Sequence, residues 1–197
     1  MALRAGGPAA GEPTVSVTVD VTFLRMEAPP ATPAPPFPPG VSVVRASRCS
    51  VAFYRYLYDT VGGPWLWWLR RTTPDSDLAR HLAHPSVAIR VLYRDGEPAG
   101  FYELEGRPDR SVNLAYFGLM PWMIGRGLGR AFLRDAVDVA WHAGAEAVTV
   151  NTCTADHPRA LPNYLACGFT PLRTLRETWP IPVRLGLTPP EHLRARG

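Results

Sequence analysis

The stretch LMPWMIGRGLGRAFL, residues 119–133, contains three glycines at alternate positions, Gly125, Gly127 and Gly129, with Arg126 between the first two and Arg130 after the last. A glycine costs about 1 kcal/mol relative to alanine inside a helix, so three of them at a helix start need a reason. The first N–H groups of a helix are free to bind an anion, and glycines remove the Cβ atoms that would hold the anion away. The stretch therefore predicts a phosphate-binding turn between a strand and a helix.

Three classes of phosphate-binding site use such a turn. A P-loop is excluded, because its motif requires a lysine and the chain contains none. A dinucleotide fingerprint has the spacing G-x-G-x-x-G and an acidic residue about twenty positions later. Here the spacing is G-x-G-x-G, and the following strand ends in VTVNTC without an acid. The dinucleotide match is therefore weak, and the third class, an acyl-CoA pyrophosphate site, is the one that a family resemblance implies.

Two motifs carry a family resemblance. LMPWMIGRGLGRAFL resembles the acyl-CoA pyrophosphate loop of the GCN5-related N-acetyltransferase (GNAT) superfamily, in which a strand and a proline precede [R/Q]-x-x-G-x-[G/A]. HPRALPNYLACGF (157–169) resembles the superfamily motif N-x-x-A-x-x-[L]-Y-x-x-x-G-F, with His157 replacing the asparagine. The resemblance covers roughly residues 41–178 and implies an α/β (α+β) fold. In that fold a mixed, mostly antiparallel central sheet is flanked by helices.

The hydrophobic pattern predicts elements in a compatible order. Expected strands are 14–26, 41–46, two around the Asp95-Gly96 turn within 86–106, 111–120, 145–153 and 169–179; expected helices are 50–62, 64–71, 75–84, 127–144 and 159–168. Residues 27–40 are rich in proline and predict an extended strap. We therefore expect an N-terminal strand and strap over 1–40, an acetyltransferase domain over 41–180 and a tail over 181–197.

Composition and residue spacing argue against several other classes of function. The net charge is +4, but all 21 basic residues are arginine and none form a dense run, so we expect no nucleic-acid partner. Cys49, Cys153 and Cys167 form no C-x-x-C pair, which indicates free thiols in a reducing compartment. His81 and His84 lack further ligand-spaced partners, so no metal site is expected. The sequence has no apolar segment typical of a signal peptide and no run of about 18 apolar residues that could span a membrane. We therefore predict a cytoplasmic protein without a membrane partner.

The resemblance implies acetyl-CoA as the cofactor and assigns residues to it. Expected contacts come from the strand before the loop, from the loop and from the second motif: Phe117, Gly118, Leu119, Gly125, Arg126, Gly127, Leu128, Gly129, Arg130 and His157. The Leu119 N–H is the expected donor to the thioester carbonyl, and Gly118 is consistent with a bulge in its strand. Ile124 departs from the family pattern, which has Arg or Gln at that position.

The resemblance also assigns the catalytic groups. Tyr164 occupies the position of a general acid toward the coenzyme A sulfur; packing beside Gly168 is its alternative role. At the two positions where family members carry a basic carboxylate, this chain has Asn113 and Thr152. We therefore take Glu103 as the candidate base, with Asp156 a weaker candidate and a solvated glutamate as the alternative for Glu103.

Aromatic residues crowd the segment where the resemblance places the acceptor. Tyr54 and Tyr58 share a helical face, as do Trp65 and Trp68, and either core packing or an acceptor pocket explains them. Few acids lie nearby, which disfavours a polyamine. The expected activity is acetyl transfer to a small-molecule amine. A peptide N-terminal acetyltransferase and a non-catalytic acyl-CoA-binding module are the alternatives, and a homodimer is possible.

Overall fold

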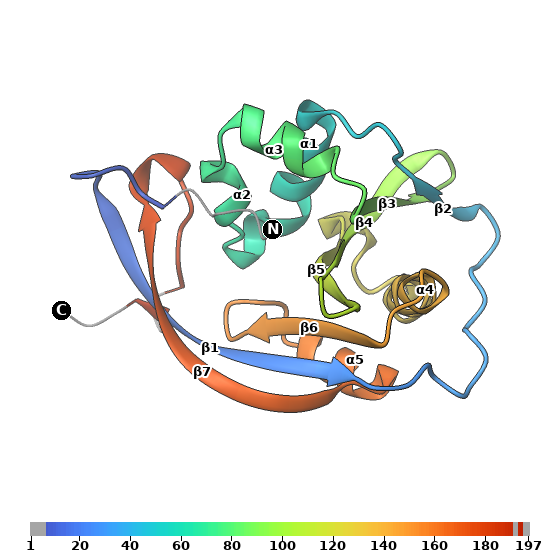
Figure 1. Ribbon diagram of the computed structural model, residues 1–197. Helices are drawn as coiled ribbons and strands as arrows, with labels where there is room; N and C mark the ends of the chain where they lie inside the picture. Colours follow the sequence, from blue (N-terminus) through green and yellow to red (C-terminus); the bar gives the residue numbers. More distant parts are fainter. Residues whose placement is uncertain (1–6, 191–192, 195–197) are drawn as a thin grey trace.

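A computed structural model describes residues 7–190 and 193–194 (Figure 1). The strands are β1 (Thr14–Met26), β2 (Val41–Arg45), β3 (Val87–Arg94), β4 (Glu97–Gly106), β5 (Ser111–Leu119), β6 (Ala147–Cys153) and β7 (Thr170–Pro182). The α-helices are α1 (Val51–Gly62), α2 (Leu69–Thr72), α3 (Asp75–Leu82), α4 (Leu128–His142) and α5 (Ala160–Cys167), and the 3-10 turns are η1 (Gly63–Trp65), η2 (Pro121–Met123) and η3 (Val183–Leu185).

The predicted order of helices and strands is confirmed, with one break. The single helix expected over 64–71 is divided into η1 and α2, because Leu66 between them has a left-handed φ of 59°. The β3–β4 hairpin turns at Asp95 and Gly96 as expected. Both have positive φ, 52° and 86°, as a tight two-residue hairpin requires.

All seven strands form one sheet in the order β2-β3-β4-β5-β6-β1-β7. Every neighbouring pair is antiparallel except β5 and β6, which are parallel. The fold class is thus the predicted mixed, mostly antiparallel sheet. Residues 1–40 were expected to precede the transferase domain as an extension. Their strand β1 instead lies inside the sheet, hydrogen-bonded to β6 on one side and β7 on the other.

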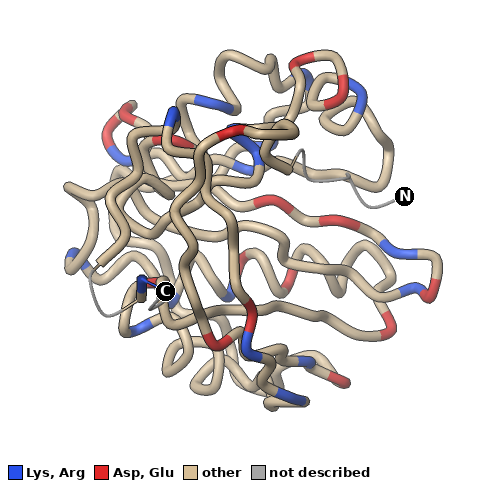
Figure 2. Tube along the Cα trace, turned by 90° about the vertical axis from the view of Figure 1, so that its left-hand side faces the viewer, with Lys and Arg blue, Asp and Glu red and all other residues tan. Residues whose placement is uncertain are grey.

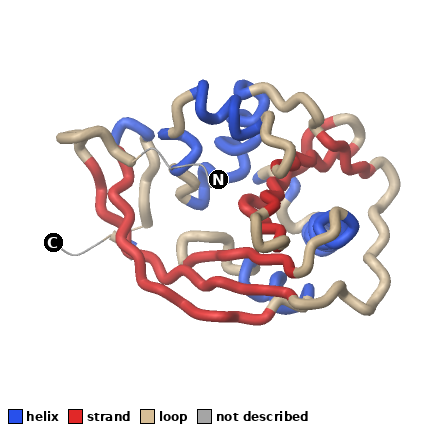
Figure 3. The backbone as a smooth tube through the Cα atoms, viewed as in Figure 1, coloured by secondary structure: helices blue, strands red, loops and turns tan. Residues whose placement is uncertain are grey.

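Helices cover both faces of the sheet, as the views of Figures 1 and 3 indicate. Neighbouring residues of β4 identify the two sides, since successive side chains of a strand point to opposite faces. Tyr102 donates a hydrogen bond to Asp135 of α4 (2.7 Å), whereas Glu103 accepts one from Tyr54 of α1. The main hydrophobic core therefore has two halves, one under α1 and one under α4.

The N-terminal half of β1 and the C-terminal half of β7 extend beyond β6 as a two-stranded ribbon, visible at the left of Figure 1. Val17 and Val19 of the ribbon and the next alternate residue, Val21, are buried in a second cluster. That cluster also contains Leu66 and Trp68, which follow η1, and Leu193 near the C-terminus. The ribbon thereby packs against the segment that joins α1 to α2.

In the view of Figure 2, arginines are interspersed with acidic residues along the chain. Many of them form ion pairs, such as Arg176 with Asp20 between β7 and β1 (2.9 Å) and Arg134 with Asp138 within α4 (2.7 Å). Among the residues that the structure describes, no helix is both long and apolar enough to span a bilayer.

Candidate active site

The site begins where β5 and β6 separate. They pair only from Ser111 with Ala147 to Leu114 with Val150. Beyond that point β5 continues along β4 and β6 continues along β1, so neither strand is paired across the gap. A bulge at Ala115, between the Leu104–Leu114 and Glu103–Tyr116 pairs, marks the divergence. The inner edge of β5 therefore has backbone groups available to a ligand.

The direction of these groups follows from strand geometry. Met120 N–H donates to Ala99 O of β4 (2.9 Å). Because N–H groups of successive strand residues point to opposite sides, the N–H of Leu119 points away from β4, into the gap. The same alternation directs the Phe117 N–H into the gap.

A cavity of about 500 Å³ occupies this gap. Predicted site residues that line it are Tyr58, Trp65, Trp68, Phe117, Gly118, Leu119, Gly125, Gly127, Leu128, Gly129, Arg130, His157 and Tyr164. Three other predicted residues, Tyr54, Glu103 and Arg126, are not among its lining residues. The cavity thus brings together β5, the glycine turn, the start of α5 and the segment after α1.

The glycine turn leads into α4 with its backbone exposed to the cavity. Gly125 and Gly127 have left-handed φ values of 80° and 79°, and a Cβ atom at either position would meet nothing within 4 Å. Gly127 is the N-cap of α4, and no side chain caps this end. The unpaired first N–H groups of the helix and the Arg130 side chain therefore lie at the cavity wall. Arg126 instead donates from Nε to Trp122 O (2.9 Å).

Replacing Gly127 by alanine tests the backbone requirement. Because an L-residue in the left-handed region is strained by roughly 1–2 kcal/mol, we expect Gly127→Ala to lower the free energy of unfolding by about 1 kcal/mol. Gly129→Ala is the matched control, since its Cβ would sit 3.9 Å from Leu119 Cδ1, an ordinary contact. Urea titration should show a lower midpoint for Gly127→Ala alone; equal midpoints would contradict the conformational explanation.

Gly118 has a different role from the one expected. It does not form the bulge, which lies at Ala115, but pairs in register with Phe101. A Cβ atom on Gly118 would come within 2.4 Å of Val61 Cγ1 on α1. Glycine is thus required here by the close packing of α1 against β5.

Tyr164 of α5 closes the cavity beside β5. Its ring packs edge-on against Phe117 and Phe169, with centroid distances of 6.5 and 5.9 Å, so both the packing role and the position at the cavity are present. Burial raises the pKa of the Tyr164 phenol well above its usual value, and the nearby charge of Asp156 raises it further. The phenol is therefore protonated throughout the neutral pH range.

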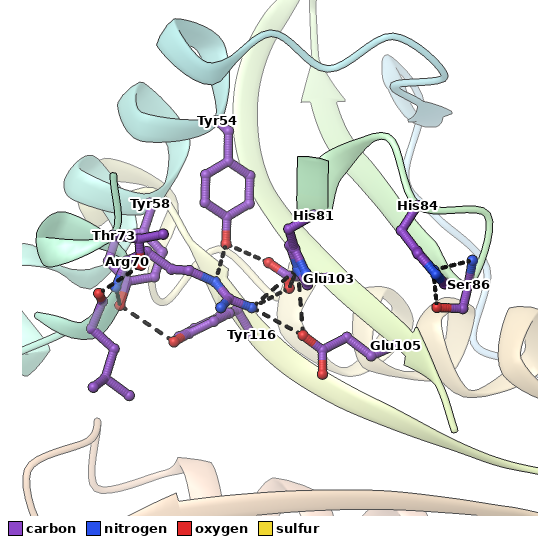
Figure 4. A network of polar contacts seen from close by, with 11 residues as sticks. Tyr54, Tyr58, Arg70, Thr73, His81, His84, Ser86, Glu103, Glu105 and Tyr116 are labelled. Atoms are coloured by element: carbon purple, nitrogen blue, oxygen red, sulfur yellow. Dashed lines mark hydrogen bonds and ion pairs between the residues drawn. The ribbon is translucent and has the colours of Figure 1, made fainter. Parts of the chain in front are cut away.

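Glu103, the predicted base, is fully buried within a polar network between α1, α2, α3 and β4 (Figure 4). Arg70 Nη2 lies 2.6 Å from Glu103 Oε1 and 3.0 Å from Glu105 Oε1. His81 Nε2 lies 2.7 Å from Glu103 Oε1, and the Tyr54 hydroxyl donates to Glu103 Oε2. The network holds α2 and α3 to the sheet.

This environment makes Glu103 unsuitable as a base. Burial alone would raise its pKa, but the hydrogen bond from His81 and the charge of Arg70 lower the pKa to about 2. A carboxylate with so low a pKa, and with its oxygens already bonded, takes up a proton poorly at neutral pH. Glu103 and Tyr54, which the sequence analysis placed in the active site, thus belong to a structural network behind it.

The same network resembles a metal site in spacing alone. Ligand atoms of His81, Glu103 and Glu105 lie within 4.8 Å of one another. However, the Arg70 guanidinium contacts both carboxylates, so a cation already occupies the position that their charges favour. We interpret the cluster as a buried ion pair network.

Aromatic side chains form another part of the cavity wall. Tyr58, Trp65 and Trp68 were predicted there, Trp67 lies in the same aromatic segment, and the sequence analysis missed Tyr116 and Trp179. Trp67 packs on Tyr58 and Tyr116 at centroid distances of 5.3 and 5.0 Å. Trp65 meets His157 edge-on at 5.0 Å. Trp179 comes from β7 in the ribbon, and no local pattern connects that strand with the site.

Comparisons with known proteins agree with this geometry. The acetyltransferase (GNAT) family model matches residues 51–169. A GCN5-related N-acetyltransferase from Kribbella flavida is similar in structure, with a TM-score of 0.59, 20% identity and coverage of 85% of this chain and 60% of the other. One from Sphaerobacter thermophilus has a TM-score of 0.62 and 16% identity over 88% and 54%. This chain thus spans little more than half of either protein.

A tandem GNAT protein from the clavulanic acid biosynthesis pathway is similar at a TM-score of 0.60 and 16% identity, covering 87% of this chain and 55% of that one. No curated protein significantly matches the sequence.

Proposed function

Because the chain belongs to the acetyltransferase (GNAT) family, in which acetyl groups are transferred from acetyl-CoA, we propose that it acetylates the primary amine of a small molecule. One observation carries the proposal. A single cavity joins an unpaired strand edge and an uncapped helix start, both suited to acyl-CoA, to an aromatic wall suited to an acceptor. Both reactants can then be held together in one complex, which removes several kcal/mol of entropic barrier.

The residues present fit acetyl-CoA. Its pyrophosphate needs N–H donors without obstructing Cβ atoms, and the turn at Gly125 and Gly127 supplies both, with Arg130 adding positive charge. Its pantetheine arm needs partners along an extended edge, as β5 offers from Ala115 to Leu119. When bound, acetyl-CoA supplies an activated acetyl group as a thioester. Ile124 lines the cavity where the family has Arg or Gln, so this loop relies on its backbone and Arg130.

Two groups of the chain act on the transfer. The Leu119 N–H, directed into the gap, donates to the acetyl carbonyl oxygen as negative charge develops there. The Tyr164 phenol, kept protonated by burial, gives a proton to the departing sulfur. Both residues line the same cavity, one on each side of the gap.

The acceptor wall favours a small molecule. Trp67 packs with Tyr58 and Tyr116, and Trp65 and Trp68 line the same cavity, so aromatic rings form much of its wall. An extended peptide would also require a chain of backbone partners, and the edge suited to that purpose is assigned to pantetheine. The presence of Tyr164 at the cavity, in the position of a general acid, favours a catalyst over an acyl-CoA-binding module.

Purified protein with acetyl-CoA and a panel of alkyl and aryl amines tests the function. We expect micromolar binding of coenzyme A by calorimetry and release of free thiol that depends on both acetyl-CoA and amine. Mass spectrometry should show an acetylated amine. Tight cofactor binding without thiol release for any amine would instead support a non-catalytic module, and acetylation of peptide N-termini alone would support the alternative acceptor.

A further inference from the structure

The cavity contains one carboxylate, that of Asp156, among the lining residues within 7–190 and 193–194. Asp156 lies in the turn between β6 and α5, at the wall shared by the cofactor half and the aromatic half of the cavity. Its neighbour His157 contacts Trp65 of the aromatic wall. The charge of Asp156 also acts on Tyr164, which lines the same cavity. Asp156 therefore shares the cavity with the expected acid and with the acceptor surface.

Two hydrogen bonds fix this carboxylate. Thr152 Oγ1 donates to Asp156 Oδ2 at 2.7 Å, and the Cys153 backbone N–H donates to the same oxygen at 3.0 Å. In the described part of the chain, Oδ1 has no hydrogen bond. One oxygen is thus anchored to the end of β6, and the other remains available to a ligand in the cavity.

Thr152 is one of the two positions where the sequence analysis looked for a basic carboxylate and found none. Its hydroxyl instead holds the carboxylate of Asp156, from a loop position that matches no motif. The chain thus presents a carboxylate at the end of β6 by a different residue. Glu103, by contrast, is enclosed behind the cavity by Arg70 and His81.

Resting on the proposed function, we propose that Asp156 is the acceptor-binding carboxylate and general base. Its free oxygen binds the ammonium group of the acceptor and removes one proton before attack. The acceptor class is an aromatic or alkyl primary amine with a single positive charge, because one carboxylate faces a wall of aromatic rings, and aromatic faces also attract a cation.

The proton and bond changes balance. The ammonium nitrogen gives one proton to Asp156 and forms a bond to the acetyl carbon as the carbon–sulfur bond breaks. Tyr164 protonates the sulfur; the second nitrogen proton leaves to solvent, and Tyr164 regains one from solvent. Asp156 then releases its proton, so that each turnover yields amide, free thiol and one proton.

The groups around Asp156 are compatible with this role. Tyr164 of α5 and Cys153 of β6 are both neutral, because burial raises the pKa of each and the Asp156 charge raises them further. His157, Arg159 and Arg130 also line the cavity. None of them contributes a second negative charge, so Asp156 is the one anionic side chain among these groups.

The experiment compares Asp156→Asn with wild type on two acceptors of similar shape, benzylamine and aniline. Benzylamine is protonated at neutral pH and must lose a proton before it can attack, whereas aniline is already neutral. We expect kcat/KM for benzylamine to fall about a hundredfold, as removal of a general base does, and that for aniline to fall less than about threefold. Asparagine retains an oxygen for the Thr152 and Cys153 hydrogen bonds, so the fold is preserved; Asp77→Asn on the exposed face of α3 is the matched control.

A second readout does not depend on turnover. Calorimetry of benzylamine against protein saturated with coenzyme A should show binding to wild type and to Asp77→Asn, and at least tenfold weaker binding to Asp156→Asn. Coenzyme A affinity should be equal in all three. Suppose that the wild type is active and that Asp156→Asn keeps the wild-type rate with benzylamine, or loses activity toward benzylamine and aniline equally. Asp156 then does not have the proposed role, while the proposed function stands. A wild type that acetylates no amine overturns the proposed function itself.

Discussion

Tyr164→Phe should lower kcat for acetyl transfer by about 10²–10³-fold, the range typical of a lost general acid. The ring packs against Phe117 and Phe169, and phenylalanine preserves that packing. Coenzyme A affinity should therefore stay within about twofold of wild type. Thiol release under saturating acetyl-CoA and calorimetric titration of coenzyme A measure the two quantities.

Tyr56→Phe is the matched control for this change. Tyr56 is exposed on α1 and does not line the cavity, so loss of its hydroxyl should leave kcat unchanged. A Tyr164→Phe enzyme with a wild-type kcat would remove the phenol from the mechanism and leave Tyr164 a packing residue. A large loss of coenzyme A affinity would likewise point to structure rather than proton transfer.

Arg70→Met should lower the free energy of unfolding by about 3–5 kcal/mol, the cost of removing one partner of a buried ion pair. Arg70 is 7% exposed and Glu103 is 0% exposed, so solvent cannot replace the lost guanidinium. Glu103 and Glu105 would then face each other with only His81 beside both. Chemical denaturation at pH 7 measures the change, and Arg80→Met on the exposed face of α3 is the control with a small expected effect.

The pH dependence of the same variant gives a sharper test. In wild type the pKa of Glu103 is lowered to about 2 from an ordinary value of 4.5, so the stability that its ionised form contributes is complete above pH 4.5 and is lost as the pH falls toward 2. In Arg70→Met, Glu103 has lost the partner that favours its ionised form. Lowering the pH should therefore reduce the free energy of unfolding of the variant less than that of wild type. The difference in free energy of unfolding between wild type and Arg70→Met should therefore be largest above pH 4.5 and become smaller below it. A difference that does not change with pH would contradict the ion-pair explanation.

Most elements of the fold could be predicted because their signals are local. The alternating valines of 14–26 and the Asp95-Gly96 turn can each be recognised from a few neighbouring residues. The partners of β1 could not be predicted, since an alternating strand pattern specifies a buried face and leaves open which strands lie beside it. The division of the expected helix over 64–71 was also missed, because leucine gives no local indication of a left-handed φ at Leu66.

The candidate site also has parts that could be predicted from the sequence and parts that could not. The glycine turn and Tyr164 belong to contiguous motifs, and the structure places both at one cavity. Glu103 seemed available because the strand pattern of β4 does not reveal that Arg70 and His81, from two separate helices, enclose it. Asp156 stood next to a recognised motif, but its anchoring by Thr152 depends on how the turn after β6 folds back.

The position of β1 also affects how the polypeptide is completed during synthesis. β1 is synthesised before the other strands of the sheet, but its two neighbours begin only at Ala147 and Thr170, so Val17, Val19 and Val21 have no native strand partners until those segments are made. A valine-rich strand with two open edges is prone to pair with other chains during that interval. The cavity also needs this late step, because Val21 and Trp179 form part of its wall. A nascent chain that stops before β7 can thus contain the complete glycine turn and still lack part of its acceptor surface.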